Sequence, residues 1–267
     1  MLPHRTLLEG ARHPEAFQTL LTLADTVLRT WEPHWSGFLS GGEQEEIEAG
    51  LTQLSELRLH WDGGVPGAER RCLRLSRAEQ AEAGGDGSET GPGSPPLQGL
   101  EISGNFLFDP ASAPDLRSVL ETLGADPREI GDLWLRGDRG AQAVVSAALA
   151  ERLDGRHSEL RTVPVQILRR PITELQPPAA RLPRPMATVE ASLRLDAVAS
   201  AGFGLPRSRV KALISQGAAR INWQRVQQPS TTVAVGDRIR LDGRGELRIL
   251  EIQTTKRDRW RLSMERR

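Results

Sequence analysis

Two stretches of the chain contain almost no side chains that a core could bury. Residues 78–96 are dominated by Gly, Ser, Pro and acidic residues, and residues 176–186 are rich in proline. Ordering the first stretch would cost conformational entropy without burying apolar surface, and prolines favour an extended spacer in the second. We therefore expect an N-terminal region at 1–77, a central domain at 97–175 and a C-terminal domain at 187–267, joined by these two linkers.

The N-terminal region predicts two helices followed by a hairpin. Pro14 can begin a helix whose apolar residues recur at helical spacing through Leu28, and a second helix is expected over Glu43–Leu57. Two short apolar runs, Leu57–Trp61 and Cys72–Leu75, then favour a hairpin that turns at Asp62-Gly63-Gly64.

The central domain alternates between strand and helix patterns in the order β-α-β-β-α-β, which is typical of a ferredoxin-like fold. The expected elements are Leu100–Phe108, Asp115–Leu123, strands near Leu133 and Ala143, Ala147–Leu153 and Val163–Leu168. RNA-recognition motifs share this order, but the third strand here has no aromatic residues to stack on bases. For Phe106 and Phe108 we favour core packing over base stacking. The whole chain is therefore expected to be α+β.

The C-terminal domain predicts two short helices followed by short strands. The helices are expected at Ala191–Ala201 and from Pro206 to Gln216, where Gly217 would end the second one. Arg207 and Lys211 are four residues apart and should lie side by side. The strands are expected at Ala219–Asn222, Val233–Val235, Arg238–Leu241, Leu247–Gln253 and Arg259–Met264.

The formal charge is distributed unevenly along the chain. Residues 1–180 carry 17 basic and 27 acidic side chains, whereas residues 181–267 carry 18 basic and 8 acidic ones. An acidic body attached to a basic module is typical of proteins that bind polyanions.

Several classes of protein and site are not favoured by the sequence. Cys72 is the only cysteine and the histidines are scattered, so we expect neither a disulfide nor a metal site. The glycine-rich stretch does not lie between a strand and a helix, so no nucleotide site is expected there. The sequence also shows no paired nucleophile and base and no metal-ligand set, so we expect no cofactor and no catalytic residue. Without a signal peptide or an apolar run of about 20 residues, the expected location is cytoplasmic, with no membrane span.

Several motifs in the C-terminal domain agree in order and spacing with one family. They are Arg194-Leu195-Asp196, Ser208-Arg209-x-x-Ala212-Leu213-Ile214-x-x-Gly217, Ile221-Asn222, Pro229-Ser230 and Val235-Gly236-Asp237-x-Ile239. The region resembles the S4 domain, a small RNA-binding module. The resemblance implies that the helices contact the backbone of structured RNA, and it implies these contact residues: Arg194, Arg207, Ser208, Arg209 and Lys211, with Gln216, Asn222 and Arg225 at the rim.

Two positions in this domain need separate comment. Trp223 stands where the family often has glycine, so we expect a different hairpin turn, with the ring covering the strand edge rather than stacking on a base. Asp196 lies in the same Arg-Leu-Asp context as the catalytic aspartate of RNA pseudouridine synthases. Because it lies inside the binding helix, a salt bridge or a helix-surface role is favoured.

Further motifs extend the resemblance to nearly the whole chain. They are Phe38-Leu39-Ser40, Asp62-Gly63-Gly64, Ala68-Glu69-Arg70-Arg71 and Leu123-Gly124-Ala125-x-x-Arg128-Glu129-Ile130-Gly131-Asp132. The chain resembles the YlmH-like proteins, most closely their cyanobacterial and plastid relatives, called photosystem II S4 domain proteins. This resemblance implies binding to ribosomal or transfer RNA, with the large ribosomal subunit as the partner.

The leading hypothesis is a non-catalytic, ribosome-associated RNA-binding protein. One alternative is an RNA-modifying enzyme, because S4 domains are often attached to catalytic units, and turnover of a nucleotide would support it. Another is an assembly or adaptor factor for photosynthetic complexes, whose acidic region would bind a protein partner. Partners that persist after nuclease treatment would favour the adaptor.

Overall fold

The computed structural model describes residues 2–78, 93, 95–179 and 183–267. The chain forms two compact units, Met1–Ala179 and Ala180–Arg267. The expected linker at 78–96 falls almost entirely outside the described residues. In the described part of the chain, no helix is both long enough and apolar enough to cross a membrane.

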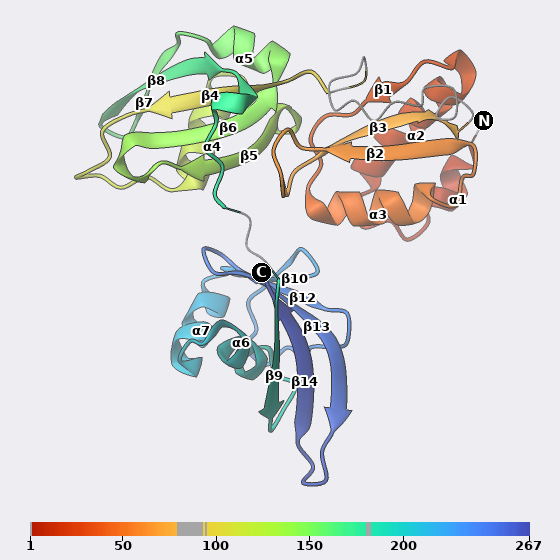
Figure 1. The fold of residues 1–267 in the computed structure, drawn as a ribbon, viewed down its shortest axis with the longest axis vertical. Coiled ribbons are helices and arrows are strands. Elements are labelled where there is room, and N and C mark those ends of the chain that lie inside the picture. The colour runs from red at the N-terminus through yellow and green to blue at the C-terminus, as the bar shows by residue number, and fades with distance from the viewer. Residues whose placement is uncertain (1, 79–92, 94, 180–182) are drawn as a thin grey trace. The chain divides into compact units, whose positions relative to one another are not determined.

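The N-terminal part of the first unit packs helices against a small antiparallel sheet (Figure 1). Its elements are α1 (His4–Leu8), α2 (Pro14–Thr30), β1 (His34–Trp35), α3 (Gly41–Leu51), β2 (Leu57–Asp62) and β3 (Cys72–Arg77), with strand order β1-β3-β2. The expected helix start at Pro14 and the expected hairpin are confirmed. The second helix was predicted too long. The helix ends at Leu51 because Leu57 already pairs with Arg77 in the sheet. Two turns between Leu51 and Leu57 redirect the chain.

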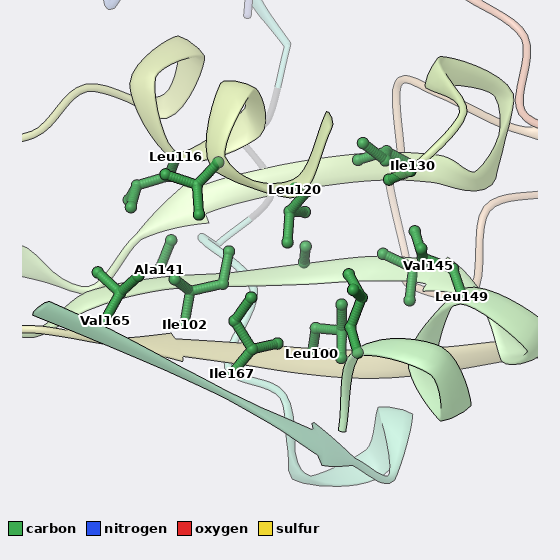
Figure 2. Close-up of a cluster of buried hydrophobic side chains, with 14 of the residues drawn as sticks. Leu100, Ile102, Leu116, Leu120, Ile130, Ala141, Val145, Leu149, Val165 and Ile167 are labelled. Carbon is green, nitrogen blue, oxygen red and sulfur yellow. The ribbon is translucent and has the colours of Figure 1, made fainter. Parts of the chain in front are cut away.

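The central part of the first unit has the expected ferredoxin-like order. Its elements are β4 (Leu97–Ser103), α4 (Ala113–Thr122), β5 (Ile130–Leu135), β6 (Gly140–Ser146), α5 (Ala147–Leu153), β7 (His157–Leu160) and β8 (Val163–Arg170). The strand order is β5-β6-β4-β8-β7 with antiparallel neighbours, so β7 is an additional edge strand that the sequence reading missed. Both helices pack on one face of the sheet, against the side chains of alternate strand residues, as Figure 2 shows.

The first central strand is shorter than predicted. It ends at Ser103 because the next amides leave the sheet, and those of Gly104 and Phe106 donate to Arg139 O and Asp138 O. Phe106 then turns into the core, which confirms its expected packing role. The same expectation for Phe108 was wrong, since this side chain is 92% exposed. The third strand, β6, is buried over most of its length, so it offers no open surface for base stacking.

A hydrogen-bond network joins the N-terminal and central parts of the first unit. The Asp132 carboxylate accepts from the backbone amides of Glu69 (2.7 Å) and Arg70 (3.0 Å). The Arg70 guanidinium donates to the carbonyl oxygens of Ile130 and Pro127 at 2.8 and 2.9 Å. The motifs around 68–71 and 123–132 therefore have a structural role, because they hold these two parts together.

Apolar packing at the same contact surrounds the hydrogen-bond network. Phe38, Cys72, Trp134, Val144 and Leu175 form one buried cluster. Backbone and side chains approach closely here, since a Cβ at Gly131 would lie 2.6 Å from Phe38 Cε1 and 2.9 Å from Val144 O. The contact therefore requires glycine at position 131.

The second unit, residues 180–267, contains two helices packed on a curved antiparallel sheet (Figure 1). Its elements are β9 (Arg184–Glu190), α6 (Leu195–Phe203), α7 (Arg207–Ser215), β10 (Ala219–Ile221), β11 (Gln224–Val226), β12 (Arg238–Leu241), β13 (Gly245–Thr254) and β14 (Trp260–Arg266). The strand order is β11-β10-β12-β13-β14-β9. One apolar core fills the space between the helices and the sheet.

Three sequence predictions for this unit were wrong. The proline-rich stretch is not a spacer throughout, because Arg184 and Pro185 pair with β14 as the start of β9. The first helix begins at Leu195 rather than Ala191, where its first amides donate to Thr231 O and Pro229 O. Val233–Val235 forms no strand, since only the Val233 side chain of this stretch is buried and Val235 is 58% exposed.

Candidate nucleic-acid interface

The two helices of the second unit bring three basic side chains around one buried carboxylate. Asp196 lies in the first turn of α6, and its side chain is fully buried. Arg194 precedes it, while Arg207 and Lys211 reach it from adjacent turns of α7. We call Asp196 with these three side chains the Asp196 cluster.

The geometry of the Asp196 cluster is set by paired hydrogen bonds. Arg207 donates from Nε to Oδ2 at 3.0 Å and from Nη2 to Oδ1 at 3.1 Å, a two-point contact with the carboxylate. Arg194 donates from Nε to Oδ1 at 3.1 Å and from Nη2 to Oδ2 at 3.4 Å. Lys211 Nζ lies 3.6 Å from Oδ2. Guanidinium groups are suited to this geometry because their donors form a rigid planar fork.

The local chain positions Asp196 where these cations can reach it. The loop at Pro229–Thr231 accepts hydrogen bonds from the first amides of α6, which fixes the helix start. On α7, Val210 and Ile214 face the core, so Arg207 and Lys211 lie along the edge of that buried face. Ordinary helix and loop packing therefore assembles the Asp196 cluster.

The carboxylate of Asp196 is ionised over the whole physiological pH range. Burial alone would raise its pKa, but the hydrogen bonds and positive charges of Arg207 and Arg194 outweigh burial and lower it to about 2. The ion pairs of Asp196 with Arg194 and Arg207 confirm the expected salt bridge, whereas the alternative of a helix-surface role was wrong because the Asp196 side chain is buried.

The outer parts of the three cations remain accessible. The side chains of Arg194, Arg207 and Lys211 are 39%, 49% and 51% exposed, whereas Asp196 is 0% exposed. Three positive charges surround one negative charge, so the cluster has a formal charge of +2. Its remaining N–H groups can donate to an external anion, and phosphate oxygens are suitable acceptors.

The other five predicted contact residues lie outside the Asp196 cluster. Ser208 and Arg209 are exposed on α7, and Gln216 is the exposed residue at its end. Asn222 and Arg225 have structural contacts. Asn222 bonds Asp237 at 2.7 Å and accepts from the Arg238 amide at 3.0 Å, while Arg225 donates to the carbonyl oxygens of Gly217 and Gln216.

The turn at Asn222-Trp223 corrects another expectation. These two residues link β10 to β11, with Ile221 paired to Gln224, and both have positive φ, at 47° and 70°. The turn thus keeps the backbone of a two-residue type I′ hairpin, with tryptophan where glycine would be unstrained. The half-buried Trp223 ring lies beside the Arg238 and Arg240 guanidiniums, whose Cζ atoms are 5.3 and 5.9 Å from the ring centroid.

The sequence reading also missed a second group of basic residues on the sheet. Arg220, Arg238, Arg240 and Arg248 lie on β10, β12 and β13, where they alternate with buried apolar residues. The alternation of arginine with apolar residues along these strands was the sequence signal that could have identified this group.

Comparisons with known proteins agree with the architecture. The S4 domain family matches residues 193–239, and the family described as "YlmH, N-terminal" matches residues 12–80. The ribosome-associated protein quality control protein P2 of Bacillus subtilis (strain 168) is 27% identical over 230 residues, which cover 86% of this chain and 85% of that protein.

A solved structure is also similar. The cell division protein YlmH from Streptococcus pneumoniae aligns with a TM-score of 0.44 and 15% sequence identity, over 61% of this chain and 94% of that chain. The family matches at both ends of the chain, together with the relative that spans most of it, support a YlmH-like S4 domain protein.

Proposed function

We propose that this protein is a non-catalytic RNA-binding protein that associates with the ribosome and holds structured ribosomal or transfer RNA through its S4 domain. The observation that carries the proposal is the Asp196 cluster, three partly exposed cations oriented by a buried carboxylate. The name of the Bacillus subtilis relative supports ribosome association.

The Asp196 cluster favours RNA because its cations are oriented before any ligand binds. A long basic side chain normally loses conformational freedom when it contacts a phosphate, and this loss weakens binding. Arg207 has already lost part of that freedom in its two-point contact with Asp196. The cluster contacts phosphate positions rather than base edges, so we expect it to recognise folded RNA by shape.

Binding should weaken steeply as salt increases. Each phosphate contact releases counterions, and about four to six contacts would give log affinity a slope of about −3 to −5 against log salt. Bulk transfer RNA should also compete better than single-stranded polyuridylate, because the latter lacks a fixed arrangement of phosphates. Equal competition by the two RNAs would contradict recognition of folded RNA.

The test is the double variant Arg207→Glu/Lys211→Glu in the full chain. Loss of two phosphate contacts should reduce the magnitude of the salt slope by about two and weaken binding to bulk transfer RNA by roughly ten- to fiftyfold near 0.15 M salt. The measurement is fluorescence anisotropy of labelled RNA across a salt series.

A matched control is Arg5→Glu/Arg29→Glu, which makes the same charge change at exposed residues of α1 and α2. It should leave both affinity and salt slope close to those of the unmodified protein. If the two double variants weaken binding equally, only the net charge matters, and the Asp196 cluster is not the binding site.

A further inference from the structure

The S4 sheet carries a second concentration of positive charge, on the face that the helices leave open. Helices α6 and α7 pack against Ile239, Leu241 and Leu247, so the alternate residues of these strands point away from the helices. On that open face Arg220 pairs directly with Arg240, and Arg238 pairs directly with Arg248. We call these four residues the arginine block.

The arginine block is unfavourable for the sheet itself. Like charges directly opposite each other on neighbouring strands destabilise the pairing. Carboxylates offset part of this charge. Asp242 forms an ion pair with Arg220, Glu246 lies 3.0 Å from Arg238 and directly opposite Arg240, and Glu265 lies directly opposite Arg248. The Asp242 side chain is 52% exposed, and an exposed pair of this kind is weak enough to yield to a phosphate.

Trp223 adds an independent observation at the edge of the arginine block. Its φ of 70° is strained for a bulky side chain, and glycine would relieve that strain. The ring nevertheless lies within cation–π distance of both Arg238 and Arg240. The ring attracts both guanidiniums and can therefore hold these two side chains in place.

The charge distribution of the unit favours the same conclusion. Residues 181–267 carry 18 basic side chains, and the Asp196 cluster uses three of them. The arginine block adds four more on a different face of the domain. Three carboxylates, those of Asp242, Glu246 and Glu265, lie next to the four guanidiniums, so the arginine block keeps a net positive charge that is complementary to a polyanion.

We propose that the arginine block is a second RNA-binding surface, which contacts backbone phosphates, and that Trp223 is a positioning residue that holds Arg238 and Arg240. This inference rests on the proposed function and deepens it. The S4 domain would contact RNA on two faces, with the Asp196 cluster on the helices and the arginine block on the sheet.

The test compares three double variants of the full chain for binding to bulk transfer RNA and to purified large-subunit ribosomal RNA. They are Arg220→Glu/Arg248→Glu on the sheet, Arg207→Glu/Lys211→Glu on the helices and Arg5→Glu/Arg29→Glu as the control. The sheet variant should reduce the magnitude of the salt slope by about two for at least one RNA and weaken its binding at least about tenfold. If the glutamates disturb folding, the variant Arg220→Gln/Arg248→Gln can be used instead. It removes the same two positive charges without adding negative charges that would repel the neighbouring carboxylates.

The outcomes separate this inference from the proposed function. Failure of the unmodified protein to bind either RNA would overturn both. If the helix variant loses affinity and the sheet variant behaves like the control, the proposed function stands and the second surface does not exist. The sheet variant could instead keep the salt slope of RNA binding and change its small-angle scattering profile. That result would mean that the arginine block contacts the acidic residues 1–179 rather than RNA, and it would overturn the proposal.

The positioning role has its own test. Trp223→Gly should keep or raise the melting temperature because glycine suits the turn, yet it should weaken RNA binding about two- to fivefold and reduce its salt slope, since Arg238 and Arg240 lose their support. Trp223→Phe retains a ring and should retain most of the affinity. If Trp223→Gly binds RNA as the unmodified protein does, the positioning role is disproved.

Discussion

Asp196 shows how one buried side chain can organise a binding surface without contacting the ligand. Its carboxylate is inaccessible, and yet it accepts hydrogen bonds from Arg194 and Arg207 and lies near Lys211. Burial of a lone charge would be costly, so the surrounding cations are needed for the fold as well as for binding.

Replacement of Asp196 should destabilise the S4 domain. Asp196→Asn keeps the shape but removes the charge, and hydrogen bonds to charged groups are worth about 1.5 to 3 kcal/mol each. We expect the local free energy of opening of α6 to fall by about that amount. Hydrogen exchange of α6 peptides in the full chain measures it, and protection equal to that of the unmodified protein would contradict the structural role of the carboxylate.

The same carboxylate should make the S4 domain sensitive to acid. The pKa of Asp196 is lowered by folding, from an ordinary value of 3.8 to about 2. The unfolded chain therefore takes up this proton first, so the stabilisation is complete above about pH 4 and is lost as the pH falls towards 2. Exchange protection of α6 should decline across that range, and more steeply than in Asp196→Asn, which has no such titration.

At the scale of elements, α7 depends on a side chain from the following hairpin. Arg225 on β11 donates to the carbonyl oxygens of Gly217 and Gln216, where the helix ends. These carbonyls would otherwise need water or another donor. Arg225, which was predicted as a rim contact for RNA, therefore has a separate role in capping the C-terminal end of α7.

Removal of the Arg225 side chain should loosen the end of α7. We expect Arg225→Ala to lower exchange protection in the last turn of α7 by about 1 to 3 kcal/mol, the usual range for hydrogen bonds from a charged donor. Arg225→Lys should restore only part of the protection, because an ammonium group is a point charge and lacks the planar set of donors with which the guanidinium reaches both carbonyls. Unchanged protection in the alanine variant would show that water replaces the guanidinium.

Elements with strong local patterns were predicted well from sequence. The helix at Ala147–Leu153 and the strand at Arg238–Leu241 match the structure residue for residue, since each has a clear apolar period. β9 was missed because Pro185 lies within it and its partner β14 is distant in sequence. Pro185 is tolerated because β9 is an edge strand of the sheet.

At the scale of the molecule, the first unit is held together by the contact between its N-terminal and central parts. Cys72 lies in the apolar cluster at this contact, 3% exposed. Burial raises the pKa of the Cys72 thiol to about 12, with a further contribution from Asp62. The thiol is therefore protonated at neutral pH and shielded from reagents.

Cys72 should report opening of this contact, because it is the only cysteine in the chain. Asp132→Ala removes the acceptor for the Glu69 and Arg70 amides and should accelerate the reaction of Cys72 with a disulfide reagent about tenfold or more. RNA binding, measured in parallel, should keep its salt slope. An unchanged labelling rate would mean that the network does not hold the contact closed.

The sequence alone determined the α+β class, the ferredoxin-like order, the S4 motifs and the basic character of the C-terminal part, because each depends on local periodicity, spacing or charge. Only the tertiary structure showed that Asp196 is buried among three cations, and that Arg220 faces Arg240 across a strand pair. These features depend on strand register and on packing between segments distant in sequence, and no local pattern encodes either of them.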